Sequence, residues 1–262
     1  MIFSFIKYQG TGNDFVIVDN RDSSFPIKEH ALIAQLCHRN YGIGADGFIA
    51  IESDTTSDFF MRYFNADGHE GSLCGNGSRC AVHYANALGL TQKEVVFRAA
   101  DGLHQAQFVG EEVALSLHDV SNWETRDKAL FIDTGSPHHI AFVVDVSAVD
   151  VATTGAVIAH GAPYYANGTN VNFVEVTAAD GLNVRTFERG VEAETLSCGT
   201  GVTAAAIGAH LSKRVTAEKI SIHTKGGILT VSFTATSNGY EAVVLQGPAT
   251  PVYKGQWEIT TK

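Results

Sequence analysis

The sequence predicts an α+β protein made of two similar halves, each a strongly curved sheet or barrel around a central helix. Three observations support this prediction. Motifs recur after a constant interval, and short apolar segments in both halves are bounded by Gly, Asn and Asp turns. An alanine-rich helical segment also follows the same glycine motif twice. We expect the halves to be related by a pseudo-twofold axis, with a cleft between them.

The internal repeat has a shift of 123 to 125 residues. This shift is far longer than a solenoid repeat, so it indicates duplication of a whole domain. The polar stretch His118–Lys128 predicts the boundary, which gives halves of residues 1–118 and 119–262. We leave open that the final strand returns to the N-terminal half. The matched segments are Gly12–Asp19 with the segment from Gly135, Gly44–Asp46 with Gly168–Asn170, Arg62–Phe64 with Arg185–Phe187, and Glu70–Gly77 with Glu194–Gly201.

Four strands are expected in each half, together with two helices. In the first half, one helix is expected over Lys28–His38, after Pro26, and the second over Ser78–Leu88. The counterpart of the second is Val202–Leu211, and both segments are rich in small residues that suit burial inside a sheet. The expected strands are Phe15–Val18, Phe48–Ile51, Phe59–Phe64 and Glu94–Phe97, then Ile140–Val144, Val171–Val176, Leu182–Phe187 and Ile220–His223.

Composition narrows the class of protein. The chain of 262 residues has a net charge of -10, which argues against nucleic acid or an anionic membrane as a main partner. The N-terminal residues lack the charged region and apolar run of a signal peptide, and no apolar stretch is long enough to span a bilayer. We therefore expect a cytoplasmic protein.

The repeat singles out two of the four cysteines. Cys74 and Cys198 occupy matching positions in Glu-x3-Cys-Gly-x-Gly, whereas Cys80 corresponds to Ala204. Cys37 and Cys80 are interpreted as small buried hydrophobic residues. The spacing of Cys74, Cys80 and His83 fits no common zinc motif, so no metal site is expected. No lysine motif for a Schiff base is visible either, so no cofactor is expected.

Each of these two cysteines precedes a glycine-rich turn that leads into a helix. Unpaired N–H groups and the positive helix end stabilise a thiolate, lowering a thiol pKa that starts near ~8.5. The same groups can bind a carboxylate. Two such loops facing one cleft would place a thiol on each side of an α-carbon. This arrangement suits inversion of a stereocentre by proton removal on one face and proton delivery on the other.

An ordered set of motifs resembles the diaminopimelate epimerase family along nearly the whole chain. The motifs are GTGNDF at 10–15, GIGADG at 42–47, FNADG at 64–68, CGNGSRC at 74–80, GSPH at 135–138, TNVNF at 169–173, FERG at 187–190 and ETLSCGTG at 194–201. The resemblance implies an isomerase that interconverts LL- and meso-diaminopimelate without pyridoxal phosphate, in lysine and peptidoglycan precursor biosynthesis. It also implies a homodimer and an active site in the cleft between the halves.

The resemblance further implies roles for individual residues. Cys74 and Cys198 would be the acid/base pair, and His138 and Glu188 would tune the thiols. Glu188 and Arg189 would also bind the distal amino-carboxylate end of the substrate. The expected substrate contacts are Asn13, Asn65, Gly75, Asn76, Asn170, Glu188, Arg189, Gly199 and Thr200.

The chain departs from the family pattern at three places. Ser136 replaces a common Asn, and Gly47 stands where some relatives have Gln. The loop Gly190–Glu194 carries one more residue than is common, for which we expect a local bulge that keeps Cys198 in place.

Two alternatives from different classes stay open. A proline or hydroxyproline racemase also uses two cysteines, but such enzymes have His where this chain has Asn76 and do not need Glu188 and Arg189. A thiol redox switch would explain the cysteines alone, but no Cys-x-x-Cys supports it. Deuterium incorporation at an α-carbon distinguishes an epimerase from a redox protein.

Overall fold

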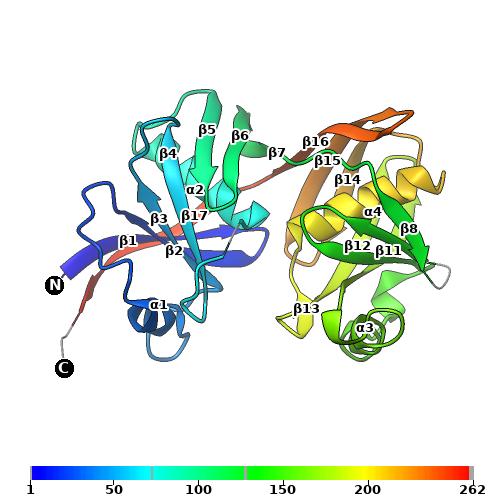
Figure 1. Ribbon diagram of the computed structural model, residues 1–262, viewed down its shortest axis with the longest axis horizontal. Helices are drawn as coiled ribbons and strands as arrows, with labels where there is room; N and C mark the ends of the chain where they lie inside the picture. Colours follow the sequence, from blue (N-terminus) through cyan, green and yellow to red (C-terminus); the bar gives the residue numbers. More distant parts are fainter. Residues whose placement is uncertain (1, 72, 127–128, 260–262) are drawn as a thin grey trace. The chain divides into compact units, whose positions relative to one another are not determined.

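The chain folds into two compact units, which the computed structural model describes over residues 2–71, 73–126 and 129–259 (Figure 1). Unit 1 comprises Met1–Leu115 together with Pro248–Lys262, and unit 2 comprises Ser116–Gly247. The division therefore falls just before the polar stretch expected as the boundary. Residues 127 and 128 of that stretch lie outside the described residues.

Unit 1 contains eight described strands and two described α-helices. Its strands are β1 (Ile2–Gly10), β2 (Asn13–Asp19), β3 (Gly47–Glu52), β4 (Phe59–Asn65), β5 (Glu94–Ala99), β6 (Gly102–Val109), β7 (Glu112–Ser116) and β17 (Thr250–Glu258). Its helices are α1 (His30–Cys37) and α2 (Gly75–Ala87).

Unit 2 repeats this set and adds a short strand and two 3-10 turns, again among the described residues. Its strands are β8 (Trp123–Arg126), β9 (Ala129–Asp133), β10 (Pro137–Phe142), β11 (Asn170–Ala178), β12 (Gly181–Glu188), β13 (Ala193–Thr195), β14 (Lys219–Thr224), β15 (Gly227–Thr236) and β16 (Gly239–Gly247). Its helices are α3 (Val151–His160) and α4 (Gly199–Leu211), and the 3-10 turns are η1 (Val146–Ala148) and η2 (Tyr165–Asn167).

The two units share one pairing scheme. In unit 1 the order is β17-β1-β2-β3-β4-β5-β6-β7, and the β2–β3 and β4–β5 pairs are parallel. In unit 2 the order is β8-β9-β10-β11-β12-β14-β15-β16, and β10–β11 and β12–β14 are parallel. Parallel neighbours need a crossover, and each of these four crossovers contains one α-helix. The predicted duplication and the two helices per half are confirmed.

The first strand of each sheet follows the last strand of the other unit in sequence, and for unit 1 it is the returning final strand that the sequence left open. In unit 2 this place belongs to β8, which follows β7 in sequence and pairs with β9. In unit 1 it belongs to β17, which follows β16 and pairs with β1 from Ile2↔Glu258 to Gln9↔Thr250. The strand after the last strand of each unit therefore completes the sheet of the other.

Helix α4 is the central helix of unit 2. Its residues from Gly201 to Ala209 are all buried, which requires protein on every side of the helix. Its apolar core includes side chains from β9 through β16, such as Ile132, Val184 and Leu245, so the sheet curves around the helix. Figure 1 shows α4 lying across β11, β12 and β14. Helix α2 contacts β1 through β4 in the same way in unit 1.

Helices α1 and α3 cover the opposite faces of the two sheets. Side chains alternate along a strand, so Phe48 and Ala50 of β3 pack with α1 residues such as Ile33. Likewise Val171 of β11 packs with Val151 of α3. Strands β3 and β11, which have a helix packed on each face, are therefore apolar on both faces.

All eight expected strands overlap observed strands, but both central helices start earlier than expected. They begin at Gly75 and Gly199, directly after the cysteines, rather than at Ser78 and Val202. The glycine turns expected before the helices are their first turns. This follows from the extended backbone of each cysteine, which ends the preceding segment at that residue.

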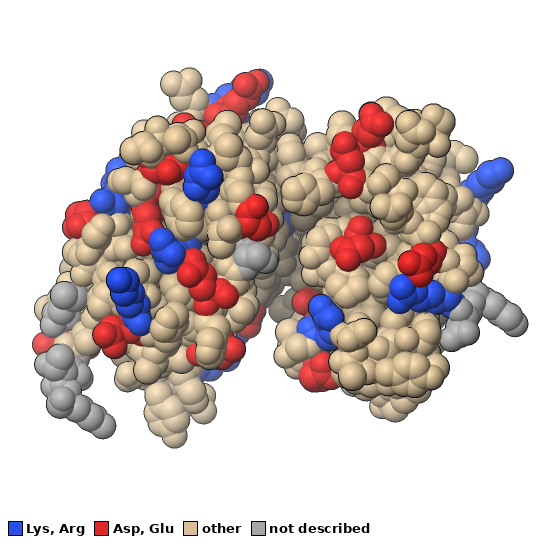
Figure 2. All heavy atoms as spheres, viewed as in Figure 1, with Lys and Arg blue, Asp and Glu red and all other residues tan. Residues whose placement is uncertain are grey.

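Charged side chains of both signs lie on the surface of the two units (Figure 2). On the face shown in Figure 2, acidic side chains occur on both units, and lysine and arginine side chains lie among them. Among the described residues, no helix has the length and apolar character needed to cross a bilayer.

Candidate functional site

Cys74 is the N-cap residue of α2. Its backbone is extended, with φ -131° and ψ 117°, and its Sγ accepts from the N–H of Gly77 at 3.5 Å. A Cβ on Gly77 would lie 3.4 Å from the Cβ of Cys74 and 3.2 Å from Ile49, so a side chain there would crowd the cap. The half-buried thiol therefore lies at the positive end of a helix, which favours its thiolate form.

Cys198 has the same place on α4, with φ -121° and ψ 113°. Its Sγ lies 3.5 Å from the hydroxyl of Thr200. A Cβ on Gly201 would lie 3.3 Å from this sulfur and 2.4 Å from Oδ1 of Asn172, so glycine is required. The two helices have equal length, and both place a thiol at their first turn.

Each Glu-x3-Cys motif has a structural explanation. Glu70 pairs with Arg62 of β4 at 2.9 Å, and Glu194 pairs with Arg185 of β12 at 2.6 Å. Both ion pairs tie the segment before a cysteine to the strand beside it. The repeated glutamates therefore anchor the cysteine loops.

An amide network surrounds Cys74. The Nδ2 of Asn13 donates to Asp46 at 2.8 Å, and a carboxylate can only accept, so Oδ1 of Asn13 faces the thiol. Cys74 donates to this oxygen at 3.5 Å, and Nδ2 of Asn76 donates to it at 3.3 Å. Arg39 in turn pairs with Asp46 at 2.6 Å. The structure thus brings three predicted residues of unit 1 together.

Asn65 lies at the end of β4, and a tyrosine orients it. The hydroxyl of Tyr63 donates to Oδ1 of Asn65 at 2.9 Å. A Cβ on Gly47 would be 2.8 Å from the Tyr63 ring and one on Gly71 equally close, so the ring lies against both glycines. The departure at Gly47 is therefore a packing requirement of this chain.

A different network lies behind Cys198. Nδ2 of Asn172 donates to the carbonyl of His139 at 3.3 Å, which fixes the amide orientation, and it also donates to Nδ1 of His138 at 3.0 Å. Burial lowers the pKa of His138 to about 3, with a smaller effect from the charge of Arg189. The neutral ring then carries its proton on Nε2 and donates to Thr200 Oγ1 at 2.9 Å.

The corresponding positions of unit 1 carry neither an imidazole nor an amide side chain. The parallel pair His138↔Asn170 in unit 2 corresponds to Phe15↔Gly47 in unit 1. The antiparallel pair Asn172↔Thr186 corresponds to Ile49↔Tyr63. In the strand register, Asn170 thus corresponds to Gly47, one residue away from Asp46, with which the sequence repeat aligned it. The polar support of Cys198 is therefore specific to unit 2.

Asn170, Glu188 and Arg189 meet at the end of β12. Oδ1 of Asn170 accepts from the backbone N–H of Arg189 at 2.9 Å, and its Nδ2 donates to the carbonyl of Pro137 at 3.2 Å. The exposed Arg189 side chain donates to the carbonyl of Asn167 at 2.7 Å. Glu188 accepts from Thr195 at 2.5 Å.

The loop after β12 turns back sharply. The N–H of Glu192 donates to the carbonyl of Glu188 at 2.8 Å, and Gly190 and Glu192 both have positive φ. Strand β13 then pairs with β12 and leads to Cys198. The extra residue expected here belongs to this tight turn. The backbone of Ser136 accepts from the N–H of Thr134 at 3.2 Å.

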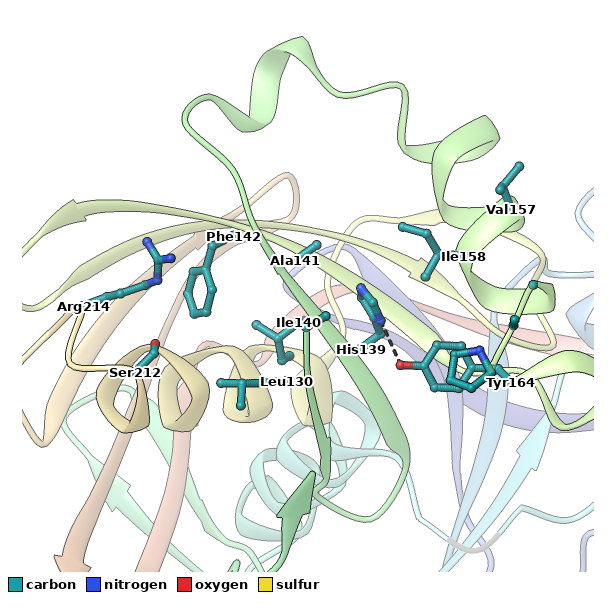
Figure 3. A pocket seen from close by; sticks show the side chains of 14 residues that line it. Leu130, His139, Ile140, Ala141, Phe142, Val157, Ile158, Tyr164, Ser212 and Arg214 are labelled. Atoms are coloured by element: carbon teal, nitrogen blue, oxygen red, sulfur yellow. Dashed lines mark hydrogen bonds between the residues drawn. The ribbon is translucent and has the colours of Figure 1, made fainter. Parts of the chain in front are cut away.

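A groove of about 680 Å³ in unit 2 is a separate feature (Figure 3). His139 and Tyr164 line it, with Nδ1 and Oη 2.8 Å apart, beside apolar side chains of β10 and α3. None of the predicted site residues lines it. Because neighbouring strand residues point to opposite faces, His138 faces away from this groove towards Thr200.

The sequence-based site lacked several contributing residues, among them Asp46, Tyr63, Asn172, and Thr186, whose hydroxyl donates to Oδ1 of Asn172 at 2.9 Å. Asn172 carried a signal, because it lies two residues after Asn170 in TNVNF and so points to the same face of the strand. The others are recognisable only from their contacts.

Comparison with known proteins assigns the family. The family model described as diaminopimelate epimerase matches residues 5–119 and 130–252. A diaminopimelate epimerase of Flavobacterium psychrophilum is 43% identical over 249 residues, covering 95% of this chain and 97% of the relative. One of Chlorobaculum tepidum is 43% identical over 256 residues, covering 94% and 98%.

Solved structures are similar at the level of the fold. A phenazine biosynthesis protein of the PhzF family from Bacillus anthracis has a TM-score of 0.81 at 15% identity, covering 99% of this chain and all of that chain. A hydroxyproline epimerase from Agrobacterium vitis has a TM-score of 0.67 at 14% identity, covering 97% and 92%. Taken with the matched thiols and the duplicated sheets, the family match shows that this chain belongs to the diaminopimelate epimerase family.

Proposed function

We propose that this chain interconverts LL- and meso-diaminopimelate by proton transfer between Cys74, Cys198 and the α-carbon, in lysine and peptidoglycan precursor biosynthesis. Two matched thiols at helix N-termini support this proposal most strongly. The family match and relatives at 43% identity, named diaminopimelate epimerases, support the substrate. The enzyme acts in the cytoplasm as a homodimer on a small molecule.

The substrate carboxylate next to the reacting carbon binds at the two helix starts. The N–H groups of Gly75, Asn76, Gly199 and Thr200 belong to the first turns of α2 and α4, and N–H groups at a helix start point outward and suit an anion. They also stabilise the negative charge that develops when the α-proton leaves. Arg189 has the planar fork that binds the distal carboxylate, and Glu188 neutralises the distal ammonium group.

The two thiols have different side-chain contacts, which suit them to different roles. Cys74 donates to Oδ1 of Asn13, which can only accept, so this contact favours the protonated thiol. Cys198 contacts the Thr200 hydroxyl, whose oxygen accepts from His138, so the hydroxyl proton can be donated to the sulfur. Cys198 is then the base and Cys74 the acid in the first half-reaction. The reverse reaction exchanges the roles.

Incubation with LL-diaminopimelate in deuterium oxide tests the proposal. We expect meso product with deuterium at the inverted carbon, and loss of epimerisation in Cys74→Ala and Cys198→Ala. Activity should survive EDTA and hydroxylamine, because the thiols need no metal or pyridoxal phosphate. Racemisation of proline without diaminopimelate turnover would favour a racemase, and thiol oxidation without deuterium exchange would favour a redox protein.

A further inference from the structure

Arg79 is a buried cation one turn after Cys74 on α2. Its side chain has no exposed surface. The guanidinium donates to Asn76 Oδ1 at 2.9 Å and Thr11 Oγ1 at 3.3 Å, and to the carbonyls of Pro248 at 3.4 Å and Gly75 at 3.5 Å. All four acceptors are neutral.

Among the described residues, no carboxylate forms an ion pair with Arg79. The ionisable groups whose charges act on it are Cys80, Cys74 and Glu112. Burial raises the pKa of Cys80 to about 12, so that thiol stays uncharged at neutral pH. A buried charge without a paired anion is costly, so a role for the charge is needed to explain its presence.

The contacts of Arg79 lead to the catalytic thiol. Arginine can only donate, so its bond to Asn76 holds Oδ1 inward and turns Nδ2 towards Asn13. Asn13 Oδ1 receives this N–H together with the thiol of Cys74. The Arg79 guanidinium thus fixes the orientation of the Asn76 amide, which donates to the same Asn13 oxygen that the Cys74 thiol contacts. Gly10 lies against it, since a Cβ there would be 3.3 Å from Nη2.

The second unit has no such charge at this place. The repeat puts Thr203 of α4 opposite Arg79, and the Thr203 hydroxyl donates to the carbonyl of Gly199 at 2.9 Å. The central helix of unit 1 therefore carries a cation where that of unit 2 carries a neutral side chain. This difference accompanies the different partners of the two thiols.

We propose that Arg79 is a positioning residue for Cys74, because it orients Asn76 and supplies the buried positive charge that stabilises the Cys74 thiolate. This inference rests on the two-thiol function proposed above. When Cys74 gives its proton to the carbon, the negative charge left on sulfur interacts favourably with the fixed charge of Arg79. The hydrogen bond from the Cys74 thiol to Asn13 stabilises the protonated form, and the charge of Arg79 stabilises the thiolate. Cys74 can therefore act as the acid in one direction of the reaction and as the base in the other.

The test compares Arg79→Gln and Arg79→Lys with Ser78→Ala. Ser78 is an equally buried neighbour on α2 whose hydroxyl contacts Met61 Sδ at 3.7 Å, so its variant controls for damage to the helix. Alkylation of Cys74 by iodoacetamide is measured in a Cys198→Ala background, with the pH varied and the site mapped by mass spectrometry. Cys37 and Cys80 do not compete, because burial raises the pKa of each to about 12. Epimerase kinetics are measured with both thiols present.

We expect Arg79→Gln to slow alkylation of Cys74 at neutral pH by about tenfold and to lower kcat by a similar factor, with KM changed less. Arg79→Lys retains the charge, so alkylation stays within about threefold of wild type, while kcat falls because the fork is lost. Circular dichroism checks that each variant folds. If Arg79→Gln does not fold, the alkylation rate and kcat of Arg79→Lys are compared with those of Ser78→Ala instead.

The inference fails if folded Arg79→Gln alkylates and turns over as Ser78→Ala does. It also fails if Arg79→Lys loses as much thiol reactivity as Arg79→Gln, because packing and not charge would then be responsible. Thiol alkylation does not depend on diaminopimelate turnover. A wild type that does not turn over diaminopimelate would therefore refute the proposed function. The alkylation rates would still test whether Arg79 raises the reactivity of Cys74.

Discussion

Replacing Thr200 with valine tests whether its hydroxyl controls the reactivity of Cys198. Valine keeps the branched shape of threonine and removes one O–H. The lost contacts are the 3.5 Å approach to Cys198 Sγ and the 2.9 Å bond from His138 Nε2. The backbone N–H groups of the first turn of α4 stay in place, so only the side-chain contribution changes.

The expected magnitude follows from these distances. A hydrogen bond to a charged group contributes about 1.5–3 kcal/mol, and the long sulfur contact indicates the lower end of that range. About 1.4 kcal/mol corresponds to a factor of ten in an equilibrium. We therefore expect a roughly tenfold smaller thiolate population at Cys198 at neutral pH. His138 also loses the acceptor of a buried N–H, which should lower the free energy of unfolding by about 1–3 kcal/mol.

The assay is the rate of alkylation of Cys198 by iodoacetamide in a Cys74→Ser background, followed by peptide mapping. Thr203→Val is the matched control, because it makes the same substitution on the same helix and removes a bond to the Gly199 carbonyl. We expect Thr200→Val to react about tenfold more slowly than the control and to show a similar loss of kcat. Equal rates for the two variants would refute the proposed support of the thiolate by the hydroxyl.

Three further predictions concern other parts of the two units. The pKa of His138 is lowered from 6.5 to about 3, so the unfolded chain binds this proton first and the free energy of unfolding falls as pH drops below about 6.5. Between about pH 7.5 and about pH 5, the free energy of unfolding should fall by about 2 kcal/mol less in His138→Gln than in the wild type, as measured by urea unfolding. An equal fall in both proteins would contradict burial of a neutral ring. Gly47→Ala should lower the free energy of unfolding by about 1–3 kcal/mol, because the new Cβ lies 2.8 Å from the Tyr63 ring and from the Phe64 carbonyl; a thermal melt equal to wild type would exclude this crowding. Arg189→Ala should raise KM for diaminopimelate about 10- to 100-fold through loss of a charge-assisted contact, and unchanged kinetics would remove Arg189 from the substrate site.

The repeated motifs were enough to predict the duplication and the place of both thiols. The reason is local: a cysteine followed by Gly-x-Gly and small residues starts a helix in either half, because the cap and the first turn depend on neighbouring residues. The strands predicted from apolar runs were also found, since each run buries at least one face in an apolar core. The first strand of unit 2, β8, was not predicted, whereas the return of the final strand to unit 1 had been left open. β17 is mostly exposed and contains Pro251, so its place depends on pairing with β1 at the other end of the chain.

Tertiary structure alone decided what surrounds each thiol. The bonds from Asn172 to His138 and from Tyr63 to Asn65 depend on strand register and side-chain direction, and the pairing of distant strands sets these. Arg79 has the sequence context of a surface helix residue, yet it is fully buried because the sheet curves around α2. Sequence determined which two sulfurs the fold presents at helix starts, because that information is contained within a few consecutive residues. Only the folded chain determined which groups hold their protons, because hydrogen bonds and burial arise between residues far apart in sequence.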